Sequence, residues 1–325
     1  MANIAGAITT SHVPAIGTAI ARGLQQDPYW RPFFDAFQGV HDWLREVRPD
    51  VVVVFYNDHG LNFFLDKMPT FAIGAANEYR YADEGWGIPA MFPPFPGHTQ
   101  LSWHLIESLV HDEFDLTTCQ EMQVDHAFAV PMALLWPGIT AWPVMTVPIA
   151  INTVQHPLPS AVRCFKLGQA VGRAIEAFPQ DLRVVIVGTG GLSHQLEGTR
   201  AGFINKEFDL MCMDRLVSDP TELTRYSNAQ LVELAGSQGV ELLMWIAARG
   251  ALTGRVSSVH SNYHIPISNT AAGLMVMENR STGYLRESQS AGSPHHGMNV
   301  LMSAKKAGDG HGRGPQPTGD DDRSQ

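Results

Sequence analysis

Short apolar runs alternate with segments of helical periodicity along the first 280 residues. Compact runs rich in β-branched residues predict buried strands at Ile4–Thr9, Val51–Tyr56 and Arg183–Val187, with a last strand at Gly273–Glu278. Apolar side chains at helical spacing predict helices at Pro32–Val47, Leu101–Val110 (with Thr99 as its N-cap), Ser160–Phe178, Asn205–Val217 and Ser227–Ala235. Alternating strands and helices are typical of an α/β fold. We therefore expect a single domain with a largely parallel or mixed central sheet flanked by helices.

Two segments depart from this pattern. The stretch Pro69–Gly97 contains many Pro and Gly residues, and we expect irregular surface structure around a pocket there. From Ser281 to Gln325 the chain has 9 apolar residues in 45, with five acidic and five basic side chains. Such a segment buries too little apolar surface to offset the entropy lost on ordering. The sequence therefore predicts a catalytic domain in residues 1–280 and a flexible tail in residues 281–325.

Composition and charge exclude several classes of partner. The chain has 22 basic and 32 acidic side chains, a formal net charge of -10, and no basic cluster longer than Lys305-Lys306. We therefore expect no nucleic-acid partner. No apolar run reaches the roughly 18 residues needed to cross a membrane, and no positive charge precedes Arg22. The three cysteines lie 45 and 48 residues apart, which gives neither a disulfide framework nor a zinc motif. We expect a soluble, cytoplasmic protein.

Three of the fourteen histidines follow predicted strands. His12 comes after the first strand in TTSHVP, His59 follows the second in YNDHG, and His194 follows the third in GTGGLSHQ. Ligands of open parallel sheets bind outside the carboxyl ends of the strands. A single histidine there is more often a packing or capping residue, but three together favour one shared site.

The residue types at these positions favour a metal. The glycine loop lacks the third glycine of a dinucleotide fingerprint and the Lys of a P-loop, and neither H-E-x-x-H nor G-x-S-x-G occurs. Two histidines and one carboxylate are the ligand set of mononuclear non-haem iron(II) oxygenases. Glu241 is the carboxylate we favour, because its neighbours in GVELLMW are apolar and a charge there needs a partner. A glutamate stabilised by a helix N-terminus explains it equally well, and Asp58 and Glu197 are alternatives that an exposed loop also explains.

Longer blocks of sequence carry a resemblance to a known family. They are SHVPAIG, YNDH, PTFAIG, ADEGWG, DEFD, VDHAF, GTGGLSHQL, RAGFINKEFDL, GVELLMW and YHIPISNTA, in this order between residue 1 and about residue 280. The chain resembles the β subunits of protocatechuate 4,5-dioxygenases, which are class III extradiol ring-cleavage dioxygenases.

The resemblance implies roles for individual residues. His12, His59 and Glu241 would ligate Fe(II), and His194 would be the acid/base histidine. His126 in VDHAF would hydrogen-bond the bound substrate or oxygen, and Asn57 would line the same pocket. Ser268 and Asn269 match the family segment that meets the carboxylate on the substrate ring.

The resemblance also implies an activity. A carboxylated catechol would be cleaved by O2 beside its hydroxyls to a muconate semialdehyde, with protocatechuate as the first substrate and gallate or 3-O-methylgallate as close alternatives. Two other classes stay open: a zinc hydrolase that uses the same two histidines and glutamate, and a binding module without activity.

A partner is expected at the mouth of the pocket. Members of the family cover the site with helices outside the β-like chain, and the predicted tail is too polar to build them. We therefore expect a small helical α subunit or a second copy of this chain. The surface that meets it would lie in Pro69–Gly97, with Tyr79, Tyr81, Trp86, Met91 and Phe92 exposed.

Overall fold

The computed structural model describes residues 1–85 and 93–280. The expected tail, and Trp86, Met91 and Phe92 of the expected partner surface, lie outside the described residues. The strands are β1 (Asn3–Thr10), β2 (Val51–Tyr56), β3 (Phe71–Gly74), β4 (Glu78–Tyr81), β5 (Phe95–Pro96), β6 (Thr117–Cys119), β7 (Gln123–Val124), β8 (Met145–Ile151), β9 (Arg183–Thr189), β10 (Val256–Ile267) and β11 (Thr270–Asn279). The helices are α1 (Pro14–Ala21), α2 (Arg31–Asp35), α3 (Gln38–Val47), α4 (Thr99–His111), α5 (His126–Leu135), α6 (Ala161–Ala177), α7 (Lys206–Ser218), α8 (Pro220–Leu223), α9 (Asn228–Ala235) and α10 (Leu242–Gly250), with a 3-10 turn, η1 (Gly239–Glu241), before α10.

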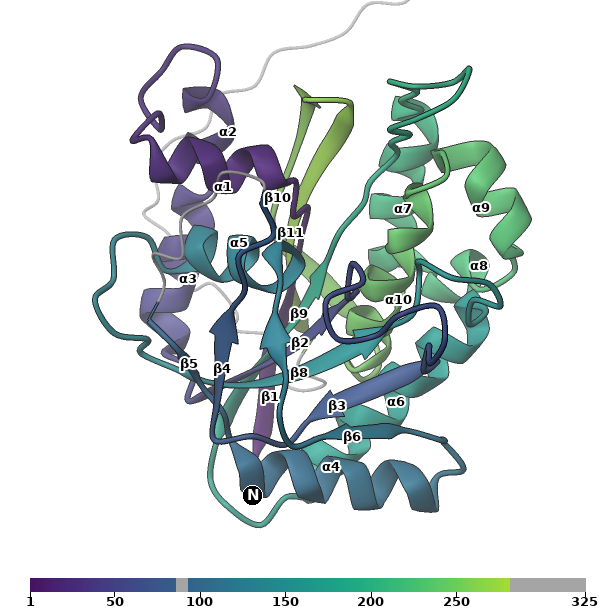
Figure 1. Cartoon of the computed structure of the whole chain (residues 1–325). Coiled ribbons are helices and arrows are strands. Elements are labelled where there is room, and N and C mark those ends of the chain that lie inside the picture. The colour runs from purple at the N-terminus through teal and green to yellow at the C-terminus, as the bar shows by residue number, and fades with distance from the viewer. Residues whose placement is uncertain (86–92, 281–325) are drawn as a thin grey trace, which may run out of the picture. The chain divides into compact units, whose positions relative to one another are not determined.

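A mixed, largely parallel sheet forms the centre of the fold (Figure 1). Its strand order is β10-β11-β1-β9-β2-β8-β3-β6. The neighbours β1, β9, β2 and β8 are parallel, whereas β11 and β10 at one side run antiparallel to them. On the other side, β3 is antiparallel to β8 and parallel to β6. The expected α/β fold is confirmed, and β8, β10 and the small sheet β5-β4-β7 are elements that the sequence pattern did not predict.

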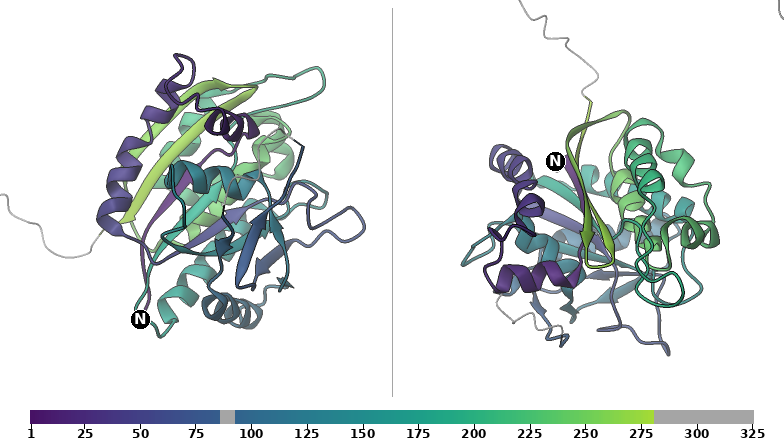
Figure 2. Two further views of the ribbon diagram at one scale, coloured as in Figure 1. Left: turned by 60° about the vertical axis from the view of Figure 1, so that its left-hand side comes forward. Right: turned by 90° about the horizontal axis from the view of Figure 1, so that it is seen from above.

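Helices cover both faces of this sheet, which explains the continuous apolar runs. In β2, Val51, Val53 and Phe55 pack with α4 and α6–α10 on one face. The alternate residues Val52, Val54 and Tyr56 pack with α1–α3 and α5 on the other. A strand buried on both faces needs apolar side chains at every position. Figure 2 shows α1–α3 and α7–α10 on opposite sides of the β10–β11 hairpin.

Several predicted boundaries need correction. The segment Pro32–Val47 forms two helices instead of one, and at the break the ring Nε2 of His260 lies 2.7 Å from the carbonyl oxygen of Ala36. The N-cap of α4 is His98, and not Thr99, since the His98 ring accepts the main-chain N–H of Leu101. Ser160, Asn205 and Ser227 do cap their helices, as their side chains accept main-chain N–H groups of the first turn.

The expectation for Pro69–Gly97 is wrong in two respects. The described part of this stretch contains β3, β4 and β5. Tyr79 is 0% and Tyr81 8% exposed, so neither forms an exposed surface. Their strand alternates between exposed and buried residues, and both tyrosines fall on the buried side. Gly74 and Gly97 make room for the Tyr79 ring, which a Cβ at either position would meet at 2.8 and 3.0 Å.

Close packing of α6, α10 and β9 fixes where α10 begins. A Cβ at Gly168 of α6 would overlap the carbonyl oxygen of Ala247 in α10, and one at Gly188 of β9 would lie 2.7 Å from the carbonyl oxygen of Met244. Glycine at both positions therefore lets the backbones approach closely. As a result, Glu241 is held over the carboxyl end of the sheet. No helix among residues 1–85 and 93–280 is long and apolar enough to cross a membrane.

Candidate active site

The parallel strands β1, β9 and β2 bring the three predicted histidines to one edge of the sheet. His12 lies two residues beyond β1, His59 three residues beyond β2, and His194 in the loop that leaves β9. Because β1, β9 and β2 are neighbours in the sheet, the three loops leave it side by side. The structure therefore brings His12, His59 and His194 together at the strand ends, where the sequence predicts them.

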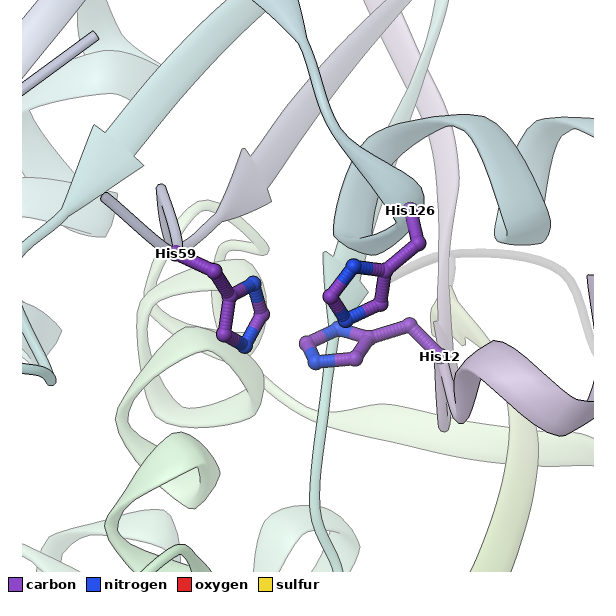
Figure 3. Close-up of side chains that lie close together, drawn as sticks. All are labelled: His12, His59 and His126. Carbon is purple, nitrogen blue, oxygen red and sulfur yellow. The ribbon is translucent and has the colours of Figure 1, made fainter. Parts of the chain in front are cut away.

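A fourth histidine, His126, joins this group from the first turn of α5 (Figure 3). One ring nitrogen each from His12, His59 and His126 lies within 4.8 Å of the other two. The rings of His59 and His126 are stacked with centroids 4.3 Å apart, and His12 meets both edge-on. The structure therefore places three imidazoles where nitrogen ligands could share one ion.

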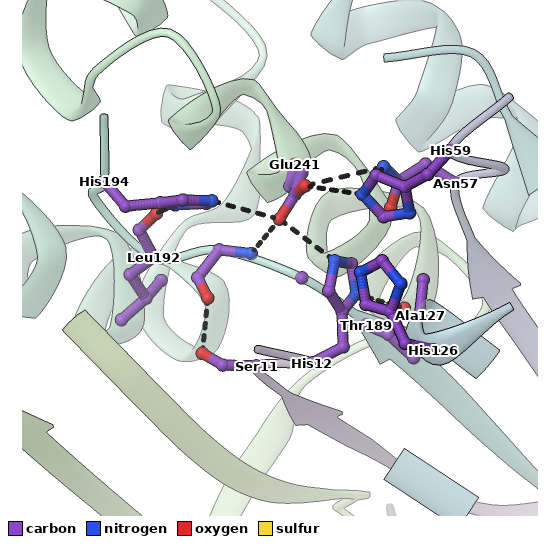
Figure 4. A network of polar contacts seen from close by, with 12 residues as sticks. Ser11, His12, Asn57, His59, His126, Ala127, Thr189, Leu192, His194 and Glu241 are labelled. Atoms are coloured by element: carbon purple, nitrogen blue, oxygen red, sulfur yellow. Dashed lines mark hydrogen bonds and ion pairs between the residues drawn. The ribbon is translucent and has the colours of Figure 1, made fainter. Parts of the chain in front are cut away.

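Glu241 supplies a carboxylate to the same place (Figure 4). Its Oε2 lies 3.4 Å from Nε2 of His12, and its Oε1 lies 3.6 Å from Nε2 of His59. Atoms that bind one octahedral ion at about 2.1 Å lie roughly 3 Å from each other. A small closure around an ion would therefore bring these three groups to ligand distances.

The backbone after β9 is shaped to admit this carboxylate. The main-chain N–H of Gly191 donates to Oε2 of Glu241 at 2.9 Å. Gly190 has φ +99°, and a Cβ there would lie 2.8 Å from the Cβ of Glu241 and 3.1 Å from the His12 ring. Glycine is therefore required at residue 190 both for the backbone conformation and for the space.

Both predicted histidine ligands have their other ring nitrogen occupied. Nδ1 of His12 lies 3.1 Å from the hydroxyl of Thr189, and Nδ1 of His59 lies 2.9 Å from Oδ2 of Asp125. Metal-binding histidines usually use the second nitrogen in this way, which fixes the tautomer and the ring orientation. The same oxygen of Asp125 accepts the main-chain N–H of His59 at 2.9 Å.

His194 faces Glu241 from the opposite side. Its Nε2 lies 3.7 Å from Oε2 of Glu241, and its Nδ1 lies 2.9 Å from the carbonyl oxygen of Leu192. A carbonyl oxygen only accepts, so Nδ1 carries the proton in the neutral ring. The lone pair on Nε2 therefore points to the site, as a proton acceptor requires.

The charges of the buried groups are coupled. Burial would raise the pKa of Glu241, but the imidazoles of His12 and His194 hold that pKa well below its usual value. Desolvation opposes charge on the partly exposed His59 and on the buried Asp125 too, yet their short contact raises the pKa of His59 and lowers that of Asp125. Burial and the neighbouring His59 lower the pKa of His126. Glu241 and Asp125 are therefore anionic among the imidazoles, a field that favours a bound cation.

A cavity of about 790 Å³ opens over these groups. His12, His59, His126, His194 and Glu241 all line it. Asn57 lines it too, and its Nδ2 lies 3.0 Å from Nε2 of His59 and 3.4 Å from Oε1 of Glu241. None of the described residues that line this cavity is Lys or Arg.

The two residues predicted to meet a carboxylate are placed differently. Ser268, in the turn between β10 and β11, lines the cavity together with Thr270. Asn269 is exposed and is not among the residues that line the cavity, and its side chain lies near Gly202. The structure therefore brings Ser268 to the wall of the site but not Asn269.

The alternative carboxylates lie elsewhere. Asp58 is 5% exposed, so the expectation of an exposed loop acid is wrong for this residue. Its carboxylate accepts main-chain N–H groups of its own loop, from Leu61, Asn62 and Phe63. Glu197 is exposed. Among the three candidate acids, the ion-pair geometry with the histidines belongs to Glu241.

Sequence reasoning missed the groups behind the histidines. Asp125 and Glu84 each accept from a histidine ring, and Thr189 contacts a third. Asp125 also caps α5 by accepting the main-chain N–H of Ala127, so the pattern of a capping residue before an apolar helix could have located it. Glu84 lies 42 residues before His126, and no local pattern connects them.

Comparisons with known proteins show the family of the chain. Residues 6–275 match a family model described as the catalytic LigB subunit of aromatic ring-opening dioxygenase. A gallate dioxygenase of Pseudomonas putida is 45% identical over 199 residues, which are 61% of this chain and 58% of that protein. A 2,3-dihydroxyphenylpropionate/2,3-dihydroxicinnamic acid 1,2-dioxygenase of Photorhabdus laumondii is 35% identical over 58% of this chain and 55% of its own.

The matches differ in how much of each relative they cover. The chain spans little more than half the length of these two relatives. A 2,3-dihydroxyphenylpropionate/2,3-dihydroxicinnamic acid 1,2-dioxygenase of Rhodococcus jostii is 30% identical over 82% of this chain and 95% of its own. An uncharacterized protein of Escherichia coli K12 is similar in structure over 85% of this chain and 100% of its own, at 14% identity and a TM-score of 0.49, which is too low to bear on the fold.

Proposed function

This chain belongs to the family of catalytic subunits of aromatic ring-opening dioxygenases, the class III extradiol enzymes, and we propose that it uses Fe(II) to open a carboxylated catechol. Gallate and protocatechuate are the substrates we place first, with 3-O-methylgallate beside them. The relative named gallate dioxygenase supports this order, since it is 45% identical, whereas the relatives named for propionate-substituted catechols are 35% and 30% identical.

One observation carries the proposal. Nε2 of His12 and Nε2 of His59 lie 3.4 and 3.6 Å from the carboxylate of Glu241, while Nδ1 of both rings is held by other groups. This donor set fits a metal that takes two imidazoles and one carboxylate and keeps its remaining positions for ligands. When bound, Fe(II) would supply a cationic centre that holds both catechol oxygens and lets electrons pass from the ring to O2.

His194 would move the proton. Its Nε2 lone pair faces the cavity beside Glu241, because Nδ1 donates to the carbonyl oxygen of Leu192. Histidine gains and loses a proton near neutral pH, so this ring can accept a phenolic proton at Nε2 and return it later in the reaction. His126 and Asn57, on the other side of Glu241, would hydrogen-bond the substrate or oxygen.

The carboxylate of the substrate would be bound by neutral donors. Ser268 and Thr270 line the cavity, and the lining side chains described include no Lys or Arg. A carboxylate can be bound well by hydroxyl and main-chain donors when they are preorganised. We keep Ser268 as the residue that meets this group, with Asn269 as a second contact if the turn moves on binding.

A partner at the mouth of the cavity stays part of the proposal. Val154 and Leu196 line the cavity and are 47% and 50% exposed, so apolar surface lies at its rim. A helical α chain or a second copy of this chain would cover it and exclude water. Sedimentation of the purified chain, combined with turnover alone and with a candidate α chain, tests this: full activity as a strict monomer contradicts it.

The decisive experiment is an assay of the Fe(II)-loaded protein. Protein purified without oxygen and loaded with Fe(II) should consume O2 and form a yellow product with gallate or protocatechuate, and respond less to 2,3-dihydroxyphenylpropionate. Metal analysis of the same sample distinguishes the dioxygenase from a zinc hydrolase. Stoichiometric zinc together with ester or amide hydrolysis, and no O2 uptake, contradicts the proposal.

A further inference from the structure

A buried carboxylate behind His126 has no part in the function described so far. Glu84 follows β4, and its Oε1 lies 2.7 Å from Nδ1 of His126. Its Oε2 accepts the main-chain N–H of the same residue at 2.7 Å. The side chains of His126 and Glu84 are 4% and 9% exposed.

Two short contacts to one residue fix the His126 ring. A buried carboxylate is costly unless donors surround it, and here both of its oxygens are paired with the same histidine. Because an ionised carboxylate only accepts hydrogen bonds, Nδ1 of His126 must carry a proton. In the neutral ring the lone pair is then on Nε2, and the His126 side chain lines the cavity.

The direction of this lone pair matters for a catechol. His126 stacks on His59 with centroids 4.3 Å apart and meets His12 edge-on, so its ring borders the proposed ligands (Figure 3). With the proton on Nδ1, Nε2 accepts a hydrogen bond from a substrate hydroxyl. With the proton on Nε2, the ring would oppose the same hydroxyl with a second donor.

We infer that Glu84 is a positioning residue, which holds His126 with Nδ1 protonated and Nε2 ready to accept a hydrogen bond from the substrate. The inference rests on the proposed function for the role of His126, whereas the tautomer of His126 is argued from its contact with Glu84. Asp125 does the same for His59, so two adjacent histidine–carboxylate pairs border the site.

Glu84→Gln tests the inference sharply, because it keeps the shape and reverses one contact. Glutamine has one acceptor and one donor. When its oxygen accepts the main-chain N–H of His126, its NH2 group faces Nδ1 and favours the tautomer with the proton on Nε2. Asp83→Asn is the matched control, since Asp83 is an exposed neighbour that loses the same charge.

The first readout needs neither metal nor substrate. Nitrogen-15 NMR of histidine-labelled, metal-free protein reports which ring nitrogen carries the proton, and His126→Ala assigns the signal. We expect the Nδ1 tautomer in the wild type and in Asp83→Asn, and a shift to the Nε2 tautomer in Glu84→Gln. A wild-type His126 with its proton on Nε2, or a tautomer unchanged in Glu84→Gln, overturns the inference.

The second readout is kinetic. Loss of a group that orients a functional histidine costs about 10–100-fold, so kcat of Glu84→Gln should fall by this factor at unchanged iron content, with a smaller change in KM. The double variant Glu84→Gln/His126→Ala should be no slower than His126→Ala. An equal further loss in the double variant shows that Glu84 acts elsewhere and contradicts the inference. Should Glu84→Gln fail to fold by circular dichroism, Glu84→Ala is put through the same comparison.

These results separate the two proposals. A wild-type protein that shows no ring cleavage with any catechol contradicts the proposed function, while the NMR result still decides the tautomer. A protein that cleaves catechols but shows no tautomer change contradicts only the inference about Glu84.

Discussion

Four histidines line the cavity together with Glu241, and they form two pairs, here called halves, that are held by different chemistry (Figure 4). His59 and His126 are backed by the carboxylates of Asp125 and Glu84, and we call them the carboxylate-backed half. His12 and His194 are backed by the Thr189 hydroxyl and the Leu192 carbonyl, and we call them the neutral-backed half. In both halves, Nδ1 of each imidazole has a hydrogen-bond partner. Only in the carboxylate-backed half is this partner negatively charged.

The proposed ligands His12 and His59 fall in different halves, so the difference bears on the two histidines that are not proposed as ligands. A carboxylate holds the proton on Nδ1 through a charge-assisted hydrogen bond, which suits His126 as a fixed acceptor at Nε2. A neutral acceptor fixes the orientation without holding the proton, which suits a histidine that must take up a proton and release it. His194 lies in the neutral-backed half, as its proposed role requires.

Removing a metal ligand should have the largest effect on activity. This effect should be the same for ligands from either half. His12→Ala, His59→Ala and Glu241→Ala should each lose bound Fe(II) and all turnover, because the remaining two groups cannot hold the ion. Metal analysis after anaerobic loading measures this, with circular dichroism to show that the fold is kept. A folded His59→Ala protein that retains its iron would remove His59 from the ligand set.

Replacing the proton carrier His194 should lower the turnover rate and leave the iron content unchanged. His194→Gln removes a proton acceptor from the neutral-backed half, and such a loss costs about 10²–10⁴ in rate. Iron content and substrate affinity should stay unchanged, which metal analysis and anaerobic substrate binding measure. If His194→Gln protein lost its iron, His194 would be a ligand and the assignment of a proton-transfer role would be wrong.

The groups behind the ligands should show the difference between halves directly. Asp125→Asn keeps a good helix N-cap but removes the charge behind His59, so Fe(II) affinity should fall by about 10–100-fold. Thr189→Val removes a neutral contact from His12 and should cost less. Competition with a chelator measures both affinities. Equal losses would show that the charge of Asp125 has no special role.

The pH dependence concerns stability and not activity, and it should come from the carboxylate-backed half. Burial would lower the pKa of His59, but Asp125 and Glu241 raise it from 6.5 to about 10 in the folded protein. A raised pKa means that the bound proton stabilises the fold fully below 6.5, and that this contribution is lost as the pH rises through about 10.

Urea unfolding of metal-free protein between about pH 6 and pH 10 measures this loss. Asp125→Asn should flatten the decline, and Thr189→Val should leave it as in the wild type. A decline of equal slope in Asp125→Asn would place its origin outside the His59–Asp125 pair.

The sequence specified the local elements and the groups at their ends. Four β-branched residues and two aromatic ones in VVVVFY suffice to predict β2, because only a strand covered on both faces tolerates such a run. The same reasoning placed His12, His59 and His194 at strand ends, and Ser160, Asn205 and Ser227 at helix starts. These features depend on residues that are close in sequence, and the pattern of hydrophobic and polar positions records them.

Other elements escaped the pattern because their partners are distant. Strand β10 is long but polar in part, and it is stabilised by pairing with β11. Tyr79 and Tyr81 looked like surface aromatics, and only the small sheet β5-β4-β7 decides that both point inward. Propensity alone cannot fix which side of a short strand is buried.

By itself the sequence determined an α/β fold with histidines gathered at one edge of a sheet, since hydrophobic periodicity and strand order along the chain are local properties. Tertiary structure alone decided which carboxylate joins them and which groups hold their rings. Glu241 lies 184 residues from Asn57 and 50 from Gly191, and Glu84 lies 42 from His126. Contacts at such separations are set by the packing of α10 on β9 and of α5 beside β2, where glycines and buried apolar faces determine how closely the elements approach.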